Sequence, residues 1–260
     1  LPIAPAISGR IMGKSVIYHY HENASVKGSF YKILSWGMQK IATSIICVST
    51  YQCSFLKRKK DVVVIPNTLS STFCQTFETI EQKKLEEEKI VLMLSSLKIY
   101  KGTLEFIKLA QSLPHYIFHL VINDSEQNIK SFISNNQINT PSNLKIFDRQ
   151  NDVTPFYKDA SLILNLSNKD LFIETFGLTA LEAMTAATPV IVPTEGGIAE
   201  MVEDGINGYK IDVHDLENIK YYIEKILSDS ELYLTLSGNA KKISKRYSTD
   251  EMCKRLVELF

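Results

Sequence analysis

Short apolar runs rich in β-branched residues alternate along the chain with longer segments in which apolar residues recur every three or four positions. The runs are almost continuously apolar, which is typical of strands buried on both faces. Their alternation with amphipathic helices predicts an α/β fold of βαβ units, with parallel sheets covered by helices. Strands are expected at residues 16–20, 44–49, 62–66, 90–95, 116–122, 144–147, 162–167 and 189–193. Helices are expected at 29–42, 51–58, 102–112, 125–135, 178–187 and 197–203, and throughout the C-terminal segment 215–260.

A stretch between the third and fourth expected strands breaks this alternation. Residues 67–89 carry turn-forming side chains followed by a dense run of charges, which is typical of a domain boundary. We assign residues 1–75 to a first Rossmann-like domain and 76–246 to a second. The first shows three strands, too few for a doubly wound domain, and the chain begins with Leu rather than Met. We therefore expect an incomplete first domain whose N-terminal part is missing.

Composition narrows the functional classes. With 260 residues and 45% hydrophobic side chains, the chain can fill a substantial core. Basic and acidic residues number 29 each, so no overall field attracts nucleic acid, and no nucleic-acid partner is expected. The four cysteines are scattered, which favours reduced thiols in a cytoplasmic protein over a disulfide framework or a zinc site. Neither a membrane-spanning run nor a signal peptide is recognisable.

A first segment with binding chemistry follows the expected strand 90–95. A short loop carries Lys98 and Lys101, and Gly102 then opens a helix. Ligands of open α/β sheets bind beyond the carboxyl ends of strands, and helix N-termini favour anions. The segment therefore suits a phosphate, but taken alone it favours the alternative of two lysines on a solvated loop.

A second segment, from Ser167 to Pro193, brackets a helix start with two carboxylates, Glu174 and Glu182. Gly177 allows close backbone approach, and the N–H groups of Gly177, Leu178 and Thr179 would face an anion. Carboxylates accept hydrogen bonds from vicinal hydroxyls, so the pair would hold the hexose and the ribose of one nucleotide sugar. The alternative is that Glu174 complements the helix dipole and Glu182 is solvated, but the strongly apolar surroundings count against it.

These segments together resemble a known family. E-x7-E in ETFGLTALEAM followed by TPVIVPTEGGIAEMVEDGINGY closely resembles glycosyltransferase family four, of the retaining type with the GT-B fold and the bacterial polysaccharide or glycoconjugate kind. SSLKIYKG, VVVIPNTL and IICVSTYQ are similar to its phosphate loop, its interdomain strand and a late strand of its first domain. The resemblance implies two Rossmann-like domains facing across a cleft, with residues 247–260 crossing back to the first domain.

The resemblance also implies residue roles. It assigns the donor sugar to Glu174, the ribose to Glu182, the diphosphate to Lys101, and further sugar and phosphate contacts to the backbone around Phe176, Gly177 and Leu178. Three positions depart from the family pattern: Ser96 replaces a phosphate-binding arginine, and Thr175 and Ala187 replace glycines. Lys98 is a candidate substitute for the missing arginine.

Two further sets of residues complete the predicted site. Asp148 and Arg149 follow a strand that lines the nucleobase slot in similar enzymes, or they belong to an exposed loop. His21 resembles a histidine that faces the donor sugar across the cleft, or it is an ordinary surface residue. With Glu174 and Lys101, His21 makes up the predicted catalytic group.

The predicted reaction is retaining transfer of a sugar from a nucleoside-diphosphate sugar to a hydroxyl of a saccharide or lipid-linked acceptor. No metal and no cofactor are expected, because no D-x-D-like motif stands out. The alternatives are a nucleotide-sugar epimerase of the same fold and a non-catalytic nucleotide-sugar-binding fragment. An apolar helix at 30–44 and the basic run 57–60 are also compatible with weak peripheral contact with the inner face of a membrane. The pattern favours the alternative of a buried crossover helix and a solvated turn.

Overall fold

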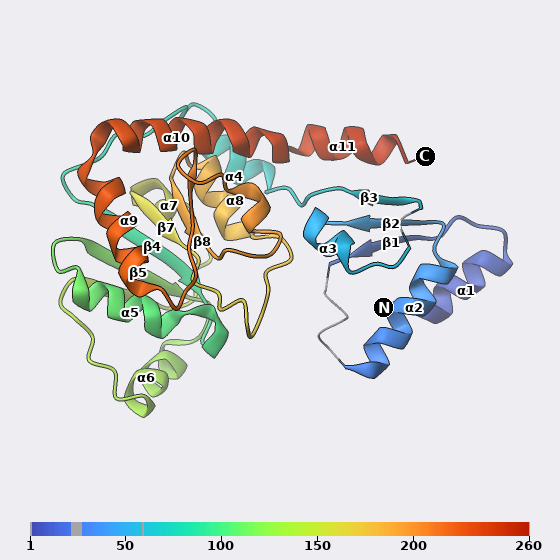
Figure 1. Ribbon diagram of the computed structural model, residues 1–260, viewed down its shortest axis with the longest axis horizontal. Helices are drawn as coiled ribbons and strands as arrows, with labels where there is room; N and C mark the ends of the chain where they lie inside the picture. Colours follow the sequence, from blue (N-terminus) through green and yellow to red (C-terminus); the bar gives the residue numbers. More distant parts are fainter. Residues whose placement is uncertain (1, 22–27, 59, 260) are drawn as a thin grey trace.

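The computed structural model describes residues 2–21, 28–58 and 60–259, which form two α/β units on separate parallel sheets (Figure 1). The smaller sheet has the order β1 (Ile17–Tyr20), β2 (Ser44–Cys47) and β3 (Val62–Val64). Helices α1 (Ile3–Ile11) and α2 (Ser29–Ile41) bury Ala6 and Met38 against it, and the short helix α3 (Thr50–Ser54) follows β2. This unit contains the three strands that the sequence predicted.

The larger sheet has six parallel strands in the order β6-β5-β4-β7-β8-β9. Their bounds are β4 (Ile90–Ser95), β5 (Ile117–Ile122), β6 (Leu144–Phe147), β7 (Leu162–Leu164), β8 (Val190–Val192) and β9 (Gly208–Lys210). The chain builds outward from β4 to β6 and then returns to place β7 on the other side of β4. The strand order therefore reverses between β4 and β7, which is where ligands of such sheets bind.

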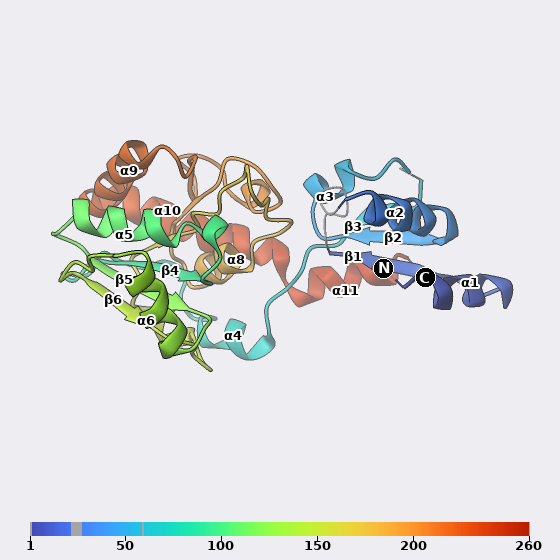
Figure 2. The same ribbon diagram turned by 90° about the horizontal axis from the view of Figure 1, so that it is seen from below.

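Two layers of helices cover the larger sheet. Helices α5 (Thr103–Ser112) and α9 (Leu216–Ser228) contribute to one core, with Ile129 of α6 (Glu126–Asn135). Helices α7 (Thr154–Asp159), α8 (Leu178–Thr185) and α10 (Ser230–Ser244) contribute Tyr157, Met184 and Ala240 to the other. In Figure 2, which views the molecule from below, α5 lies in front and α10 is fainter and farther away. The two separate parallel sheets with flanking helices confirm the predicted α/β fold and agree with the expected GT-B arrangement.

Several helices begin where a short polar side chain can cap their first free N–H groups. Ser125 caps α6, Asp229 caps α10 and Ser248 caps the last helix, α11 (Thr249–Val257). The caps at Asp229 and Ser248 divide the helical C-terminus predicted for 215–260. This segment forms α9, α10, the 3-10 turn Lys245–Tyr247 and α11. Figure 1 shows α10 and α11 running from the larger unit to the smaller one.

The eight predicted strands all form, mostly one or two residues shorter than expected. Four elements were missed: α1, α4 (Ser71–Thr76), α7 and β9. They are short and rich in glycine, proline, serine or threonine, so they lack a clear hydrophobic period. The helix expected at 51–58 ends at Ser54, and the one expected at 197–203 is only the 3-10 turn Ala199–Met201.

The chain between the two sheets associates with the larger unit. Leu69 and Phe73 pack against its second core, and Phe77 is fully buried within that core. At the other end of the chain, the guanidinium of Arg255 in α11 donates a hydrogen bond of 3.3 Å to the carbonyl of Val64 in β3. The domain limits at residues 75 and 246 stay predictions.

Candidate functional site

A cavity of 300 Å³ opens where the strand order reverses, beyond the carboxyl ends of β4 and β7. The loops after these two strands supply most of its polar wall. Six of the predicted site residues line this cavity together: Lys101, Glu174, Phe176, Gly177, Leu178 and Thr179. Asn67 from the interdomain segment and Asn165 from the loop after β7 line it as well.

Lys101 and Glu174 form an ion pair at this cavity, although 73 residues separate them in sequence. Lys101 ends the 3-10 turn Ile99–Lys101, and Glu174 lies in the loop before α8. Their side chains are 25% and 16% exposed. The Oε1 atom of Glu174 also accepts a hydrogen bond of 3.0 Å from Ser167. Among the described residues nothing donates to Oε2, so that oxygen can accept from a ligand.

Two aromatic rings support Lys101. Tyr100 and Phe172 stack with centroids 4.6 Å apart, and the Nζ atom of Lys101 lies 5.7 Å from the first centroid and 5.4 Å from the second. A cation over aromatic faces gains electrostatic attraction. The stack therefore restricts Lys101 to the cavity edge where Glu174 lies.

The start of α8 brings backbone N–H groups to the same cavity. Gly177 has φ 126°, and an added Cβ would lie 2.5 Å from Cγ1 of Ile198, so only glycine fits without rearrangement. No side chain caps this helix. The free N–H groups of its first turn are available to an anion at the cavity wall.

Glu182 lies one helical turn further along α8 and does not line the cavity. The hydroxyl of Tyr157 in α7 donates to its Oε2 atom. Burial raises the pKa of Glu182, and the Tyr157 hydrogen bond opposes that rise. The solvated-surface alternative is therefore wrong for Glu182, because this carboxyl is mostly buried and already has a partner.

The remaining predicted residues lie outside the cavity. Lys98 is exposed, with Nζ 5.7 Å from the centroid of Tyr100. Asp148 and Arg149 are exposed after β6, and the guanidinium of Arg149 donates to the side chain of Asn123 at 2.8 Å. His21 is exposed beside His19, with ring centroids 4.0 Å apart.

Backbone and side-chain hydrogen bonds join the smaller unit to the loop that carries Glu174. The hydroxyl of Thr175 donates to the carbonyl of His21 at 3.0 Å, and the hydroxyl of Ser49 donates to the carbonyl of Thr175 at 2.7 Å. The carboxylate of Glu200 accepts from the backbone N–H groups of Thr50, at 3.0 Å, and Tyr51. We call these four hydrogen bonds the interdomain clasp. They hold the Glu174 loop and the 3-10 turn that carries Glu200 against the smaller unit.

Sequence reasoning missed Ser167, Tyr157 and Glu200. Ser167 was placed at a strand end without a role, Tyr157 lies in a helix that was not expected, and Glu200 was passed over among the charges of the segment after β8. Each acts through a partner at least seven residues away. Only Ser167 could have been proposed from the sequence, because it lies near Glu174, at the end of the expected strand that precedes the Glu174 loop.

Two classes of feature are missing from the part of the chain that the structure describes. It contains no group of three or more His, Cys, Asp or Glu side chains that could hold a metal ion. No helix in it combines the length and the apolar character needed to cross a bilayer. Metal independence stays a prediction.

Comparison with known proteins relates this site to one family. Residues 75–243 match the family model described as "Glycosyl transferases group 1". A D-inositol 3-phosphate glycosyltransferase from Salinispora arenicola is 31% identical over 109 residues, which are 42% of this chain and 23% of that protein. A sucrose synthase from Melioribacter roseus is 40% identical over 91 residues, which are 33% of this chain and 12% of that protein. The first two curated relatives are matched over 26% and 34% of their own length.

Solved structures extend the likeness to almost the whole chain. The Anabaena protein HepE, in complex with UDP and glucose, has a TM-score of 0.79 at 20% identity, covering 98% of this chain and 73% of HepE. A sucrose-phosphate synthase from Thermosynechococcus elongatus has a TM-score of 0.75 at 18% identity, covering 98% and 70%. At these identities the likeness concerns the fold, and it confirms the predicted GT-B architecture.

Proposed function

Because this chain belongs to the group 1 glycosyl transferases, we propose that it transfers a sugar, with retained anomeric configuration, from a nucleoside-diphosphate sugar to a hydroxyl acceptor. The observation that carries this proposal is the Lys101–Glu174 pair beside the uncapped start of α8. It combines a cation, free N–H groups and a carboxylate at one cavity where the strand order reverses.

The diphosphate of the donor lies between Lys101 and the first turn of α8. Both groups stabilise the negative charge that develops on the departing diphosphate, and being held in place beforehand they need little reorganisation. This arrangement supplies positive charge without a metal ion. Lys98, exposed two residues before Tyr100, adds a mobile cation in place of the arginine that the family pattern has at Ser96.

The donor sugar is oriented by Glu174. Its Oε2 atom accepts sugar hydroxyls while Oε1 keeps its contacts with Lys101 and Ser167. Holding the anomeric carbon toward the acceptor lowers the entropic cost of reaction. The acceptor attacks on the face that the diphosphate leaves, and a phosphate oxygen takes its proton, so no protein general base is assigned.

The nucleoside extends along α8 toward Glu182, which binds the ribose from the same helical face as Leu178. Its hydrogen bond with Tyr157 orients the carboxyl for that contact. Asp148 and Arg149 adjoin the nucleobase, and His21 faces the sugar from the smaller unit. The UDP bound in the structure of HepE supports a uridine nucleotide as the first donor to test.

The acceptor is a saccharide or a lipid-linked saccharide of a surface polysaccharide or glycoconjugate. Phe30, Ile33 and Trp36 on α2 are 68%, 65% and 60% exposed. This exposed row supports weak peripheral contact of the smaller unit with a membrane surface. The whole protein would then work at the inner face of the membrane.

Glu174→Gln tests the proposal. The variant keeps the side-chain shape but loses the charge, so we expect binding of a UDP-sugar to weaken about tenfold and turnover to fall about a hundredfold. Isothermal titration and a transfer assay with the full-length protein measure these two quantities. Glu217→Gln, on an exposed carboxylate of α9, is the matched control and should change neither.

The same assay separates the alternatives. Epimerised nucleotide sugar without a transfer product would indicate a nucleotide-sugar epimerase. Tight donor binding without turnover in the full-length protein would indicate a binding module. Unchanged donor binding and turnover in both Glu174→Gln and Glu182→Gln would contradict the proposed site itself.

A further inference from the structure

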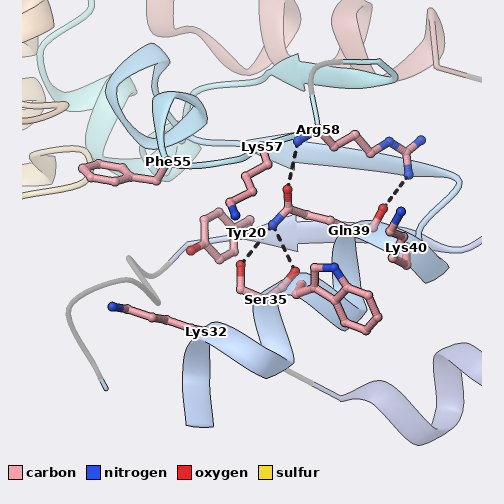
Figure 3. Close-up of a pocket in the computed structure, with 9 residues that line it drawn as sticks. Tyr20, Lys32, Ser35, Gln39, Lys40, Phe55, Lys57 and Arg58 are labelled. Carbon is pink, nitrogen blue, oxygen red and sulfur yellow. Dashed lines mark hydrogen bonds between the residues drawn. The ribbon is translucent and has the colours of Figure 1, made fainter. Parts of the chain in front are cut away.

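A second cavity, of 730 Å³, lies on the smaller unit between the end of β1, helix α2 and the segment after α3 (Figure 3). It is larger than the donor cavity of 300 Å³. Nine residues line it: Tyr20, Lys32, Ser35, Trp36, Gln39, Lys40, Phe55, Lys57 and Arg58. Four are basic, three are aromatic and none carries a carboxylate.

Three of the basic side chains lack a partner among the described residues. Lys32, Lys40 and Lys57 are exposed, and no ion pair, hydrogen bond or ring contact of their ammonium groups occurs in the part of the chain that the structure describes. Figure 3 shows Lys57 directed toward Tyr20, with Lys32 and Lys40 on either side of the hollow. Like charges gathered around one hollow repel each other, and a bound anion would relieve that repulsion.

Arg58 has a structural task instead. Its guanidinium donates to the carbonyls of Gln39, Ala42, Thr43 and Lys60 at 2.6 to 3.1 Å, and to the carboxylate of Asp61 at 3.0 Å. These contacts fasten the segment after α3 to the end of α2. The three lysines therefore project from a fixed frame.

The floor of the cavity is also organised. The side-chain carbonyl of Gln39 accepts from the backbone N–H of Arg58 at 3.0 Å, and its amide donates to the carbonyl of Ser35 at 3.2 Å. A floor held in place in this way loses little conformational entropy when a ligand binds.

Two aromatic side chains give the cavity an apolar wall. Trp36 is 60% exposed and Phe55 is 38% exposed, whereas Tyr20 is buried beneath them. Exposed aromatic rings offer flat faces on which a sugar ring or an apolar tail can pack. The cavity therefore combines groups for an anion with groups for an uncharged moiety of the same ligand.

Its position links it to the donor cavity. Tyr20 lines this second cavity, and the carbonyl of the next residue, His21, accepts the hydroxyl hydrogen bond of Thr175. Thr175 itself lines the donor cavity beside Glu174. A ligand in the second cavity thus lies on the smaller unit, at the end of the strand that contacts the donor loop.

We propose that this cavity binds a phosphate group of the acceptor, with Lys32, Lys40 and Lys57 as its cationic ligands and Trp36 packed against the uncharged part. The inference rests on the proposed function, because it names the chemical class of the acceptor. The phosphate belongs to a soluble sugar phosphate or to the headgroup of a lipid carrier, since both present the same anion.

Trp36 makes the cavity directly observable, because it is the only tryptophan of the chain. Tryptophan fluorescence of this 260-residue chain is titrated with glucose 1-phosphate and with vesicles of phosphatidylcholine containing phosphatidylglycerol. Glucose, which is uncharged, and pure phosphatidylcholine vesicles, whose headgroup phosphate is balanced by its choline cation, are the controls without net charge. We expect a saturable change with only one of the two net-anionic probes, and the responding probe identifies the source of the phosphate.

Single variants Lys40→Gln and Lys57→Gln should each weaken that response about tenfold, as loss of a charge-assisted hydrogen bond predicts. Lys14→Gln, on an exposed lysine of the same unit that does not line the cavity, should leave it unchanged. No response to either net-anionic probe would overturn the proposal. So would an equal response to the controls without net charge, or an equal loss in Lys14→Gln.

The two proposals fail separately. The titration needs no donor, and binding of a UDP-sugar is measured in the same variants. Lost phosphate binding with intact donor binding and turnover would remove the acceptor proposal and leave the glycosyltransferase proposal standing. Phosphate binding in a protein that neither binds nor uses nucleotide sugars would remove the glycosyltransferase proposal and leave a phosphate site without an acceptor role.

Discussion

At the scale of single residues, the partly buried Lys83 joins separate segments of the larger unit. The ammonium of Lys83 donates to the carbonyls of Tyr157 and Ala160 at 2.6 and 3.2 Å, and to the hydroxyl of Thr188 at 2.8 Å. It joins the charged segment before β4 to the end of α7 and to the residues before β8. The hydroxyl of Tyr157 in turn donates a hydrogen bond to Glu182. Lys83 therefore helps to position Tyr157, and through it the carboxylate that is predicted to bind the ribose.

Burial lowers the pKa of Lys83 from 10.5 to about 8. Between these values the unfolded chain binds more protons at this lysine than the folded chain does, so the free energy of unfolding rises with pH. From pH 8 to pH 10 we expect wild type to gain about 2 kcal/mol relative to Lys83→Met. Urea unfolding at several pH values measures this difference.

The neighbouring residue supplies the control for that measurement. Lys84 is exposed, so Lys84→Met should show the same pH-dependent rise as wild type. A rise of equal size in Lys83→Met would mean that another group causes it.

At the scale of elements, the connection from α8 to β8 carries backbone strain. Ala187 has φ 55°, in the left-handed region that favours glycine, at a position where the family pattern has glycine. Its neighbour Ala186 has φ −78°. Both side chains are fully buried, so the two positions differ mainly in backbone conformation.

Replacing each alanine by glycine separates strain from packing. Both variants lose a buried methyl and gain unfolded-state entropy, but only Ala187→Gly also relieves about 1–2 kcal/mol of left-handed strain. We expect Ala186→Gly to lose about 1 kcal/mol more stability than Ala187→Gly. Equal losses in urea denaturation would show that the connection is not strained.

At the scale of the whole molecule, the interdomain clasp holds the donor loop against the smaller unit. Glu200 accepts two backbone N–H groups of α3, and Ser49 and His21 contact Thr175, next to Glu174. Helix α11 adds the Arg255–Val64 contact on another part of the smaller unit. Separation of the two units would break these contacts together.

Removing the Glu200 carboxylate leaves two N–H groups without their charged acceptor. We expect Glu200→Ala to increase the population of separated units by about tenfold or more, because both lost hydrogen bonds are charge-assisted. Small-angle scattering would show a larger radius of gyration, and protease would cut the interdomain segment faster. Glu203→Ala, on an exposed carboxylate in the same segment, should match wild type in both measurements.

The predictable part of the site is the part that is local in sequence. Glu174, Gly177 and Leu178 lie within five residues of one another, so a single loop and helix start could be recognised as an anion and sugar site. Lys101 could be proposed because it follows a buried strand and precedes a helix. His21, Asp148 and Arg149 were proposed by resemblance alone, and they lie outside the donor cavity.

The amino-acid sequence by itself determined every described strand except β9, most of the longer helices and the segment that contains Glu174, because hydrophobic period and glycine placement act between near neighbours. Only the tertiary structure decided which groups meet. It paired Lys101 with Glu174, gave Glu182 a buried tyrosine partner, joined Glu200 to α3 and gathered three lysines around a second cavity. Most of these contacts join residues more than twenty positions apart, where the order of the strands rather than any local pattern sets the distance.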